Sequence, residues 1–324
     1  MKYIIITSIN PITEAVKKFA KINDWHILII GDKKSICYTH ENLTFLDINN
    51  QKELNFLSFE TTPINHYSRK NLGYLYAIRN NATLIYDTDD DTFPYENWTV
   101  NDFICQNNVE SLEFVNPFEF FTKEKCWPRG TPLSQINKPN NYSINKQDSK
   151  IGVWQGIIDD DSDFDAIYRL TNDKHIKFDK NKQISINKNC YSVFNSQSTL
   201  WNKDLNCLLY IPISVDFRFT DILRGYIAQR IMWEFNYQLG FHSPNTYQIR
   251  NEHDYFKDFL GEISMYQNVP KLIKILNDID LQGENMQNCL LKIYNSLYLN
   301  KIVQENELKN LNNWIKDYNF NKND

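Results

Sequence analysis

The stretch RKNLGYLYAIRNNATLIYDTDDD, residues 69–91, decides the fold that we expect for this chain. It reads as a basic turn, a helix over residues 69–80, an apolar strand over residues 83–86 and then an acidic run. The strand is short and rich in aliphatic and aromatic residues, as is typical of a strand buried inside a parallel sheet. Ligands of open α/β sheets bind beyond the carboxyl ends of the strands. The acidic run therefore falls where a ligand site is expected.

Strands and helices alternate through the first 90 residues. Apolar runs predict strands over residues 2–9, 25–30 and 43–46, and a helix fills the interval over residues 11–20. The helix and strand described above complete the series. Such an alternation predicts a Rossmann-like α/β fold with a mixed, mostly parallel sheet flanked by helices.

The acidic run holds four carboxylates: Asp87, Asp89, Asp90 and Asp91. Crowded carboxylates repel one another and raise one another's pKa unless a cation lies among them, and a hard divalent ion suits such oxygen ligands. Arg69 and Lys70 begin the preceding helix, whose N-terminus favours a phosphate. An isolated acidic run is more often a solvated surface turn. Its position after an apolar strand favours a metal and phosphate site.

Three segments follow. Residues 126–150 are rich in Pro, Asn, Ser and Lys and predict a long loop, either a lid or an acceptor-side loop. A second acidic cluster, residues 159–165, is open to two interpretations, helix N-capping and ligand binding. Residues 217–240 predict an amphipathic helix that a Thr-Asp pair opens and Gly240 closes.

The pattern is helical from residue 253 to the end. We therefore expect two parts, a sheet-containing domain over residues 1–250 and a helical C-terminal region over residues 251–324. The helical region either covers the sheet or mediates homo-oligomerisation.

Composition excludes several classes of protein. The 324 residues, 42% of them hydrophobic, suffice for a globular enzyme, and a net charge of −5 argues against a nucleic-acid partner. The six cysteines form no C-x-x-C pair, which predicts free thiols in a reducing, cytoplasmic setting. The N-terminal apolar run is too short for a signal peptide or a membrane span, so no transmembrane segment is expected.

Ordered blocks of sequence resemble the STELLO-like glycosyltransferase family. They are GDKK (31–34), RKNLGYLYAI (69–78), IYDTDDD (85–91), CWPRGTPL (126–133), DFDAIYRLT (163–171), FNSQST (194–199), RFTDILRGYIAQR (218–230) and RNEHDYFKDFLGE (250–262). More remotely, the positions of Asn71, Asp89 and the Thr220-Asp221 pair are similar to those of family-two glycosyltransferases, which have a GT-A fold.

The resemblance implies a GT-A-like catalytic domain that transfers a sugar to a glycan or another hydroxyl acceptor, with inversion favoured. The donor is a nucleoside diphosphate sugar, a UDP-sugar being favoured, and Mn²⁺ or Mg²⁺ is the cofactor. The residues that it implies for the nucleotide are Thr7, Asp32, Arg69, Lys70, Asn71, Asp89 and Asp90. Those implied for the metal are Asp89, Asp91 and His253.

Acceptor-side residues follow from the same resemblance. Asp221 takes the place of the carboxylate that deprotonates the acceptor hydroxyl, and Asp161 is the rival catalytic base. The residues that it implies for acceptor binding are Arg129, Trp154, Asp160 and Asp163, with Asp160 and Asp163 as further rival bases.

Two other functions remain open at this point. The acidic run also resembles that of the reversibly glycosylated proteins, which are nucleotide-sugar mutases. A non-catalytic protein that organises other glycan-synthesising enzymes is the second alternative, although the acids Asp89, Asp91 and Asp221 argue against loss of activity.

Overall fold

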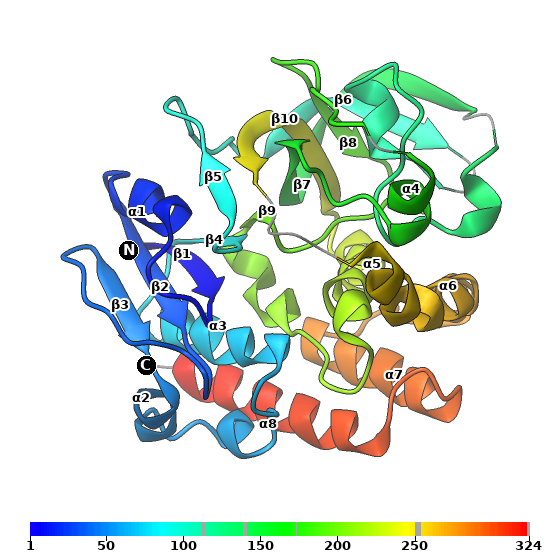
Figure 1. Cartoon of the computed structure of the whole chain (residues 1–324). Coiled ribbons are helices and arrows are strands. Elements are labelled where there is room, and N and C mark those ends of the chain that lie inside the picture. Colours follow the sequence, from blue (N-terminus) through cyan, green and yellow to red (C-terminus); the bar gives the residue numbers. More distant parts are fainter. Residues whose placement is uncertain (112–113, 139–140, 173, 250–253, 323–324) are drawn as a thin grey trace.

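A computed structural model describes residues 1–111, 114–138, 141–172, 174–249 and 254–322 (Figure 1). Its described strands form a single sheet in the order β3-β2-β1-β4-β9-β7-β6-β8-β10-β5, with an additional pairing between β7 and β10. The strands are β1 (Lys2–Thr7), β2 (Trp25–Ile30), β3 (Leu43–Leu46), β4 (Leu84–Thr88), β5 (Thr92–Pro94), β6 (Ile104–Ser111), β7 (Tyr142–Asp160), β8 (Gln183–Ile186), β9 (Ser198–Trp201) and β10 (Gln238–Gln248).

The helices pack around this sheet. They are α1 (Glu14–Ala20), α2 (Ile48–Glu53), α3 (Lys70–Arg79), α4 (Ala166–Thr171), α5 (Thr220–Glu234), α6 (Tyr255–Asp278), α7 (Met286–Leu299) and α8 (Glu305–Lys322). The predicted mixed α/β class, with a helical C-terminal region, is confirmed.

One half of the sheet is parallel. Strands β3, β2, β1 and β4 run in the same direction, and β1 pairs with β2 and with β4 on its two sides. Apart from His26, the interior residues of β1 and β2 are buried, which explains their largely apolar sequences. Strand β4 extends two residues past the predicted end, so Asp87 lies inside it and is fully buried.

The other half is mixed. Strand β9 pairs antiparallel with β4 and β7, while β10 runs parallel to β7. The long strand β7 begins at Tyr142, so the predicted loop over residues 126–150 is wrong for its last nine residues. All of those residues except Ser149 are exposed, and the segment pairs with β6. Its polar composition carries no apolar alternation that would mark a strand.

Helix α5 differs from its prediction in two respects. It ends at Glu234, and Gly240 lies in β10, where a Cβ atom would come within 2.5 Å of the Trp154 ring. It is also buried on nearly every side, and only its residues Arg230 and Glu234 are partly or fully exposed. The reason is that α5 contacts β10 on one side and α6 and α7 on another (Figure 1).

The C-terminal helices share the core of the sheet domain. Helix α8 lies beside α3. It also contacts the segment before α5, because the Trp314 indole donates to the Cys207 carbonyl at 3.0 Å. Side chains from α6, α7 and α8 belong to the same buried apolar cluster as the α3 side chains. In the part of the chain that the structure describes, no helix has both the length and the apolarity needed to cross a membrane.

Candidate functional site

A cleft of about 460 Å³ opens at the carboxyl ends of β1, β2 and β4. Its lining includes Thr7, Asp32, Tyr67, Asp89, Asp90, Asp91, Phe217, Arg218 and Gln248. A smaller chamber of about 80 Å³ adjoins it and shares Tyr67, Asp89, Gln197, Phe217 and Arg218. Four further residues line only the chamber: Arg129, Asp163, Thr220 and Asp221. The two spaces together join some of the residues predicted for the donor with three predicted for the acceptor side: Arg129, Asp163 and Asp221.

A buried charge centre supports the floor of the cleft. Lys70 Nζ lies 2.6 Å from one carboxylate oxygen of Asp87, and Arg224 Nη1 lies 3.0 Å from the other. The Tyr74 hydroxyl donates to Asp87 at 2.7 Å, and Lys70 also donates to the Thr88 carbonyl at 2.7 Å. Lys70 therefore fixes the carboxyl end of β4 through Asp87 and Thr88.

The three consecutive acids point in different directions. Asp89 accepts a hydrogen bond from the Tyr67 hydroxyl at 2.9 Å, and Asp91 accepts one from Gln248 Nε2 at 3.0 Å. The Asp90 carboxylate is bound by the Ser8 hydroxyl and by Asn10 Nδ2 on the loop after β1. Asp90 thus ties β4 to the β1 loop, Asp89 lies beside Tyr67 just before α3, and Asp91 lies beside the end of β10.

The environment of Asp89 favours a cation. Burial raises the pKa of Asp89, Lys70 opposes the rise, and the neighbouring Asp91 and Asp87 add to it, which brings the pKa to about 7. A further positive charge near Asp89 would relieve this repulsion.

Two carboxylates, Asp89 and Asp91, supply oxygen ligands at the cleft. Among the described residues, no group of three His, Cys, Asp or Glu side chains is arranged to hold a metal ion. Mg²⁺ is commonly held by one or two carboxylates together with the phosphates of a substrate, and Mn²⁺ prefers the same ligands. The donor set therefore suits a metal that arrives with a diphosphate. His253, the third predicted ligand, lies outside the described residues.

Other predicted nucleotide residues have structural partners. Asp32 accepts the backbone N–H groups of Asn65 at 2.8 Å and His66 at 3.2 Å, which holds the turn before α3 at the cleft. The buried Arg69 guanidinium donates to Gln51 Oε1 and to the Thr62 carbonyl, and burial lowers its pKa to about 10.

Asn71 lies away from the cleft. Its side-chain amide exchanges two hydrogen bonds of 2.8 Å with the backbone of Ile211, and it is fully buried. Thr7, which the resemblance implied for the nucleotide, lines the cleft at the end of β1.

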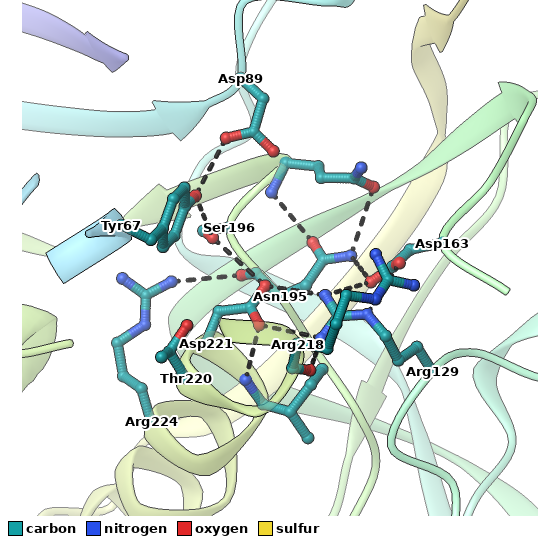
Figure 2. Close-up of polar contacts among 12 residues, drawn as sticks. Tyr67, Asp89, Arg129, Asp163, Asn195, Ser196, Arg218, Thr220, Asp221 and Arg224 are labelled. Carbon is teal, nitrogen blue, oxygen red and sulfur yellow. Dashed lines mark hydrogen bonds and ion pairs between the residues drawn. The ribbon is translucent and has the colours of Figure 1, made fainter. Parts of the chain in front are cut away.

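Arg129 organises the acceptor side (Figure 2). Its guanidinium donates from Nη1 and Nη2 to the two oxygens of Asp221, both at 3.1 Å, and from Nε to Asp163 at 3.0 Å. Nη2 lies 2.8 Å from the second oxygen of Asp163, and Nη1 also donates to the Arg218 carbonyl. Asp221 and Asp163 are thereby fixed beside each other by one planar cation.

The remaining predicted acceptor residues do not line the cleft or the chamber. Asp160 pairs with Lys177 at 2.6 Å and Asp161 with Arg169 at 2.5 Å. Trp154 is fully buried, with its indole donating to the Asp102 carbonyl at 2.9 Å, which corrects the expectation that its ring meets a sugar. Asp165 caps α4 through Tyr168 N, so N-capping is confirmed for part of the second acidic cluster.

Sequence reasoning missed Tyr67, Ser196 and Gln248. Tyr67 precedes the Arg69–Lys70 pair, and Ser196 lies within the quoted FNSQST block, yet neither residue type by itself indicates a site. Gln248 closes β10, a strand that the sequence did not predict.

The parallel half-sheet, the cleft at its carboxyl edge and the acids that follow β4 define a GT-A-like α/β protein. Residues 218–322 match the family model described as STELLO glycosyltransferases.

Two curated relatives from Arabidopsis thaliana are similar over most of this chain. "Probable glycosyltransferase STELLO1" is 26% identical over 98% of this chain and 44% of the relative. "Probable glycosyltransferase STELLO2" is 29% identical over 85% of this chain and 39% of the relative. The chain thus spans less than half the length of these relatives. The resemblance to STELLO-like glycosyltransferases predicted from the motif blocks is confirmed, and the names of the relatives support the predicted class of enzyme.

Proposed function

We propose that this protein is a metal-dependent glycosyltransferase that moves a sugar from a nucleoside diphosphate sugar to a hydroxyl group of a glycan or similar acceptor. A UDP-sugar is the favoured donor. One observation carries the proposal: Asp89, at the donor cleft, and Asp221, the expected base, line the same small chamber. A bound sugar at the junction would lie between the two carboxylates.

The donor side combines polar strand ends with acidic residues. Thr7 and Asp32 lie where a nucleoside would enter, and Asp89 and Asp91 would hold the divalent ion. When bound, that ion stabilises the negative charge that develops on the departing diphosphate without a proton transfer.

On the acceptor side, Asp221 is the proposed general base. It takes the proton of the acceptor hydroxyl while that oxygen bonds to the anomeric carbon and the bond to the diphosphate breaks. Arg129 and the backbone N–H of Ile222, which donates at 3.0 Å, hold its carboxylate in place. A base acting directly on the acceptor, with no covalent intermediate, favours inversion.

Asp221 is preferred over the other acids on grounds of geometry and resemblance. Asp160 and Asp161 bind lysine and arginine outside the two spaces. Asp163 lines the chamber and, like Asp221, accepts from Arg129 through both oxygens, with a further bond from Asn195 Nδ2 at 2.9 Å. Between these two acids the resemblance to family-two glycosyltransferases, which places the base at Asp221, decides.

A thermal-shift and calorimetric screen tests the proposal. UDP-, GDP-, CMP- and ADP-sugars are added with and without Mn²⁺ to the wild type, to Asp91→Ala and to the control Asp160→Ala, whose acid lies outside the cleft. We expect one nucleotide class to stabilise the wild type and the control by about 2.7 kcal/mol at a hundredfold excess over Kd, only with Mn²⁺.

Loss of this stabilisation in Asp91→Ala is the expected result. No stabilisation of the wild type by any nucleotide sugar would contradict the proposal and favour a non-catalytic partner protein. Conversion of the sugar ring form without an acceptor would instead identify a mutase.

A further inference from the structure

A pair of hydroxyl groups connects the donor-side and acceptor-side carboxylates. The Tyr67 hydroxyl lies 2.9 Å from Asp89 Oδ1 and 2.6 Å from the Ser196 hydroxyl. The Ser196 hydroxyl in turn lies 3.3 Å from Asp221 Oδ2. Figure 2 shows the four side chains in this order, and Tyr67 lines both the cleft and the chamber.

The number of hydroxyl protons limits which of these hydrogen bonds can form at the same time. Lys70 Nζ donates to the Tyr67 oxygen at 3.0 Å, so the phenol has only its own proton to give, either to Asp89 or to Ser196. Ser196 also has one proton, for either Tyr67 or Asp221. Two protons serve three contacts. The Tyr67 and Ser196 oxygens are only 2.6 Å apart and would repel each other without a proton between them, which leaves two arrangements. In one, Tyr67 donates to Asp89 and Ser196 donates to Tyr67. In the other, Tyr67 donates to Ser196 and Ser196 donates to Asp221.

The backbone around Ser196 is firmly held, so a change of arrangement requires only rotation of hydroxyl hydrogens. The preceding Asn195 donates its N–H to Gln155 at 2.9 Å, and its carbonyl accepts from Thr199 Oγ1 at 2.9 Å. The following Gln197 carbonyl accepts from Thr88 Oγ1 at 2.5 Å. Ser196 is 1% exposed, so solvent does not replace its partners.

We propose that Tyr67 and Ser196 are positioning residues that couple occupancy of the donor site to the hydrogen bonding of Asp221. This inference rests on the proposed function. A ligand that engages Asp89 Oδ1 releases the Tyr67 proton to Ser196, and Ser196 then donates to Asp221. Asp221, which Arg129 and the Ile222 N–H already hold, thus gains the Ser196 hydrogen bond only when the donor is present.

Calorimetric titration with UDP and Mn²⁺ tests the coupling in four proteins: the wild type, Ser196→Ala, Tyr67→Phe and the double variant. Without the Ser196 hydroxyl, the Tyr67 hydroxyl can donate its proton only to Asp89, where it competes with the ligand for Asp89 Oδ1. We expect Ser196→Ala to weaken UDP–Mn²⁺ binding about three- to tenfold, the worth of one hydrogen bond. In the Tyr67→Phe background the same change should have no effect.

Ser196→Thr retains a hydroxyl and should bind UDP–Mn²⁺ as the wild type does. Each alanine or phenylalanine change removes one oxygen, so the Tyr67 ring keeps its edge contact with Phe217, and thermal unfolding verifies that each variant folds. If Tyr67→Phe fails to fold, the UDP–Mn²⁺ affinities of Ser196→Ala and Ser196→Thr test the coupling instead.

Equal weakening by Ser196→Ala in both backgrounds, no weakening in the wild-type background, or equal weakening by Ser196→Thr would overturn the coupling. In each case the wild type still binds UDP–Mn²⁺ and the proposed function stands. A wild type that does not bind UDP–Mn²⁺ overturns the UDP donor assignment and, with it, the coupling.

Discussion

Asp89 is an acid whose charged form the folded protein disfavours. Its pKa of about 7 lies far above the ordinary value of 3.8, with burial as the first cause. The folded state therefore binds a proton that the unfolded state has already lost between about pH 4 and pH 7. The contribution of this residue to the free energy of unfolding falls as pH rises through that window.

Asp89→Asn should remove this pH dependence. Urea unfolding at intervals from pH 4 to pH 8 would show the wild type losing stability relative to Asp89→Asn as pH increases. Binding that needs the ionised carboxylate has the opposite trend, so the affinity for Mn²⁺ with UDP should increase up to about pH 7 and then level. A stability difference that is constant with pH would contradict the buried, proton-binding state of Asp89.

Asp87, two residues earlier, has a structural role. It is fully buried between Lys70 and Arg224, and its removal leaves two buried cations without their carboxylate. We expect Asp87→Ala to lower the free energy of unfolding by about 3–5 kcal/mol. Urea denaturation measures the loss, with the exposed Asp148→Ala as the control. Equal stability of the two variants would show that the ion centre contributes nothing.

At the scale of elements, α5 closely approaches the loop over residues 194–197, which carries Ser196, at Gly225. A Cβ atom on Gly225 would come within 2.7 Å of the Phe194 carbonyl. Alanine normally stabilises a helix interior by about 1 kcal/mol relative to glycine. Here it would force the helix and the loop apart, so we expect Gly225→Ala to destabilise the protein by about 1–3 kcal/mol.

Gly261→Ala in α6 is the matched control. Its new methyl group would meet only the flexible Arg218 side chain, at 3.3 Å. A change within about 1 kcal/mol is expected there, of either sign. Thermal unfolding of both variants gives the comparison, and a stabilised Gly225→Ala would refute the close packing of α5 on the loop.

Sequence patterns predicted short strands that appear in the sequence as apolar runs between polar turns. Strand β2 lies at the predicted residues because a short apolar run between polar turns matches a buried parallel strand. The edge strand β3 also lies at the predicted residues, although only Leu46 in it is buried. Strands β7 and β10 are harder to predict, since residues 142–149 are almost entirely exposed and β10 carries Gly240 and a proline. The end of α5 was missed because a helix buried on nearly all sides has no polar face to mark its limits.

The same reasoning explains which site residues were predicted. The acids after β4 lie at the cleft because the carboxyl ends of parallel strands share one edge of a sheet. The acids after β7 could not be assigned, because Asp160 has a positive φ of 68° that redirects the chain at this point. Trp154 lies within a strand, where the face toward the core depends on the tertiary structure.

For the molecule as a whole, the C-terminal helices are tied to the sheet domain by buried polar contacts. Glu307 on α8 accepts hydrogen bonds from Tyr210 and Ser214, and Asp317 accepts the backbone N–H groups of Leu57 and Ser58. Because these contacts and one apolar core join the two parts, we expect a single cooperative unfolding transition. Differential scanning calorimetry should give equal calorimetric and van't Hoff enthalpies, whereas two separate transitions would show that the helical region folds independently.

The molecule brings Asp89 and the proposed base, Asp221, into one chamber from segments more than 100 residues apart in the sequence. The most direct test of this arrangement is turnover of the donor identified by the binding screen, measured as release of free nucleoside diphosphate, in the wild type and in Asp221→Asn. We expect Asp221→Asn still to bind the donor and to lose turnover by about 100-fold or more, as for removal of a general base. Undiminished turnover in a folded Asp221→Asn variant would contradict the assignment of Asp221 and the site built around it.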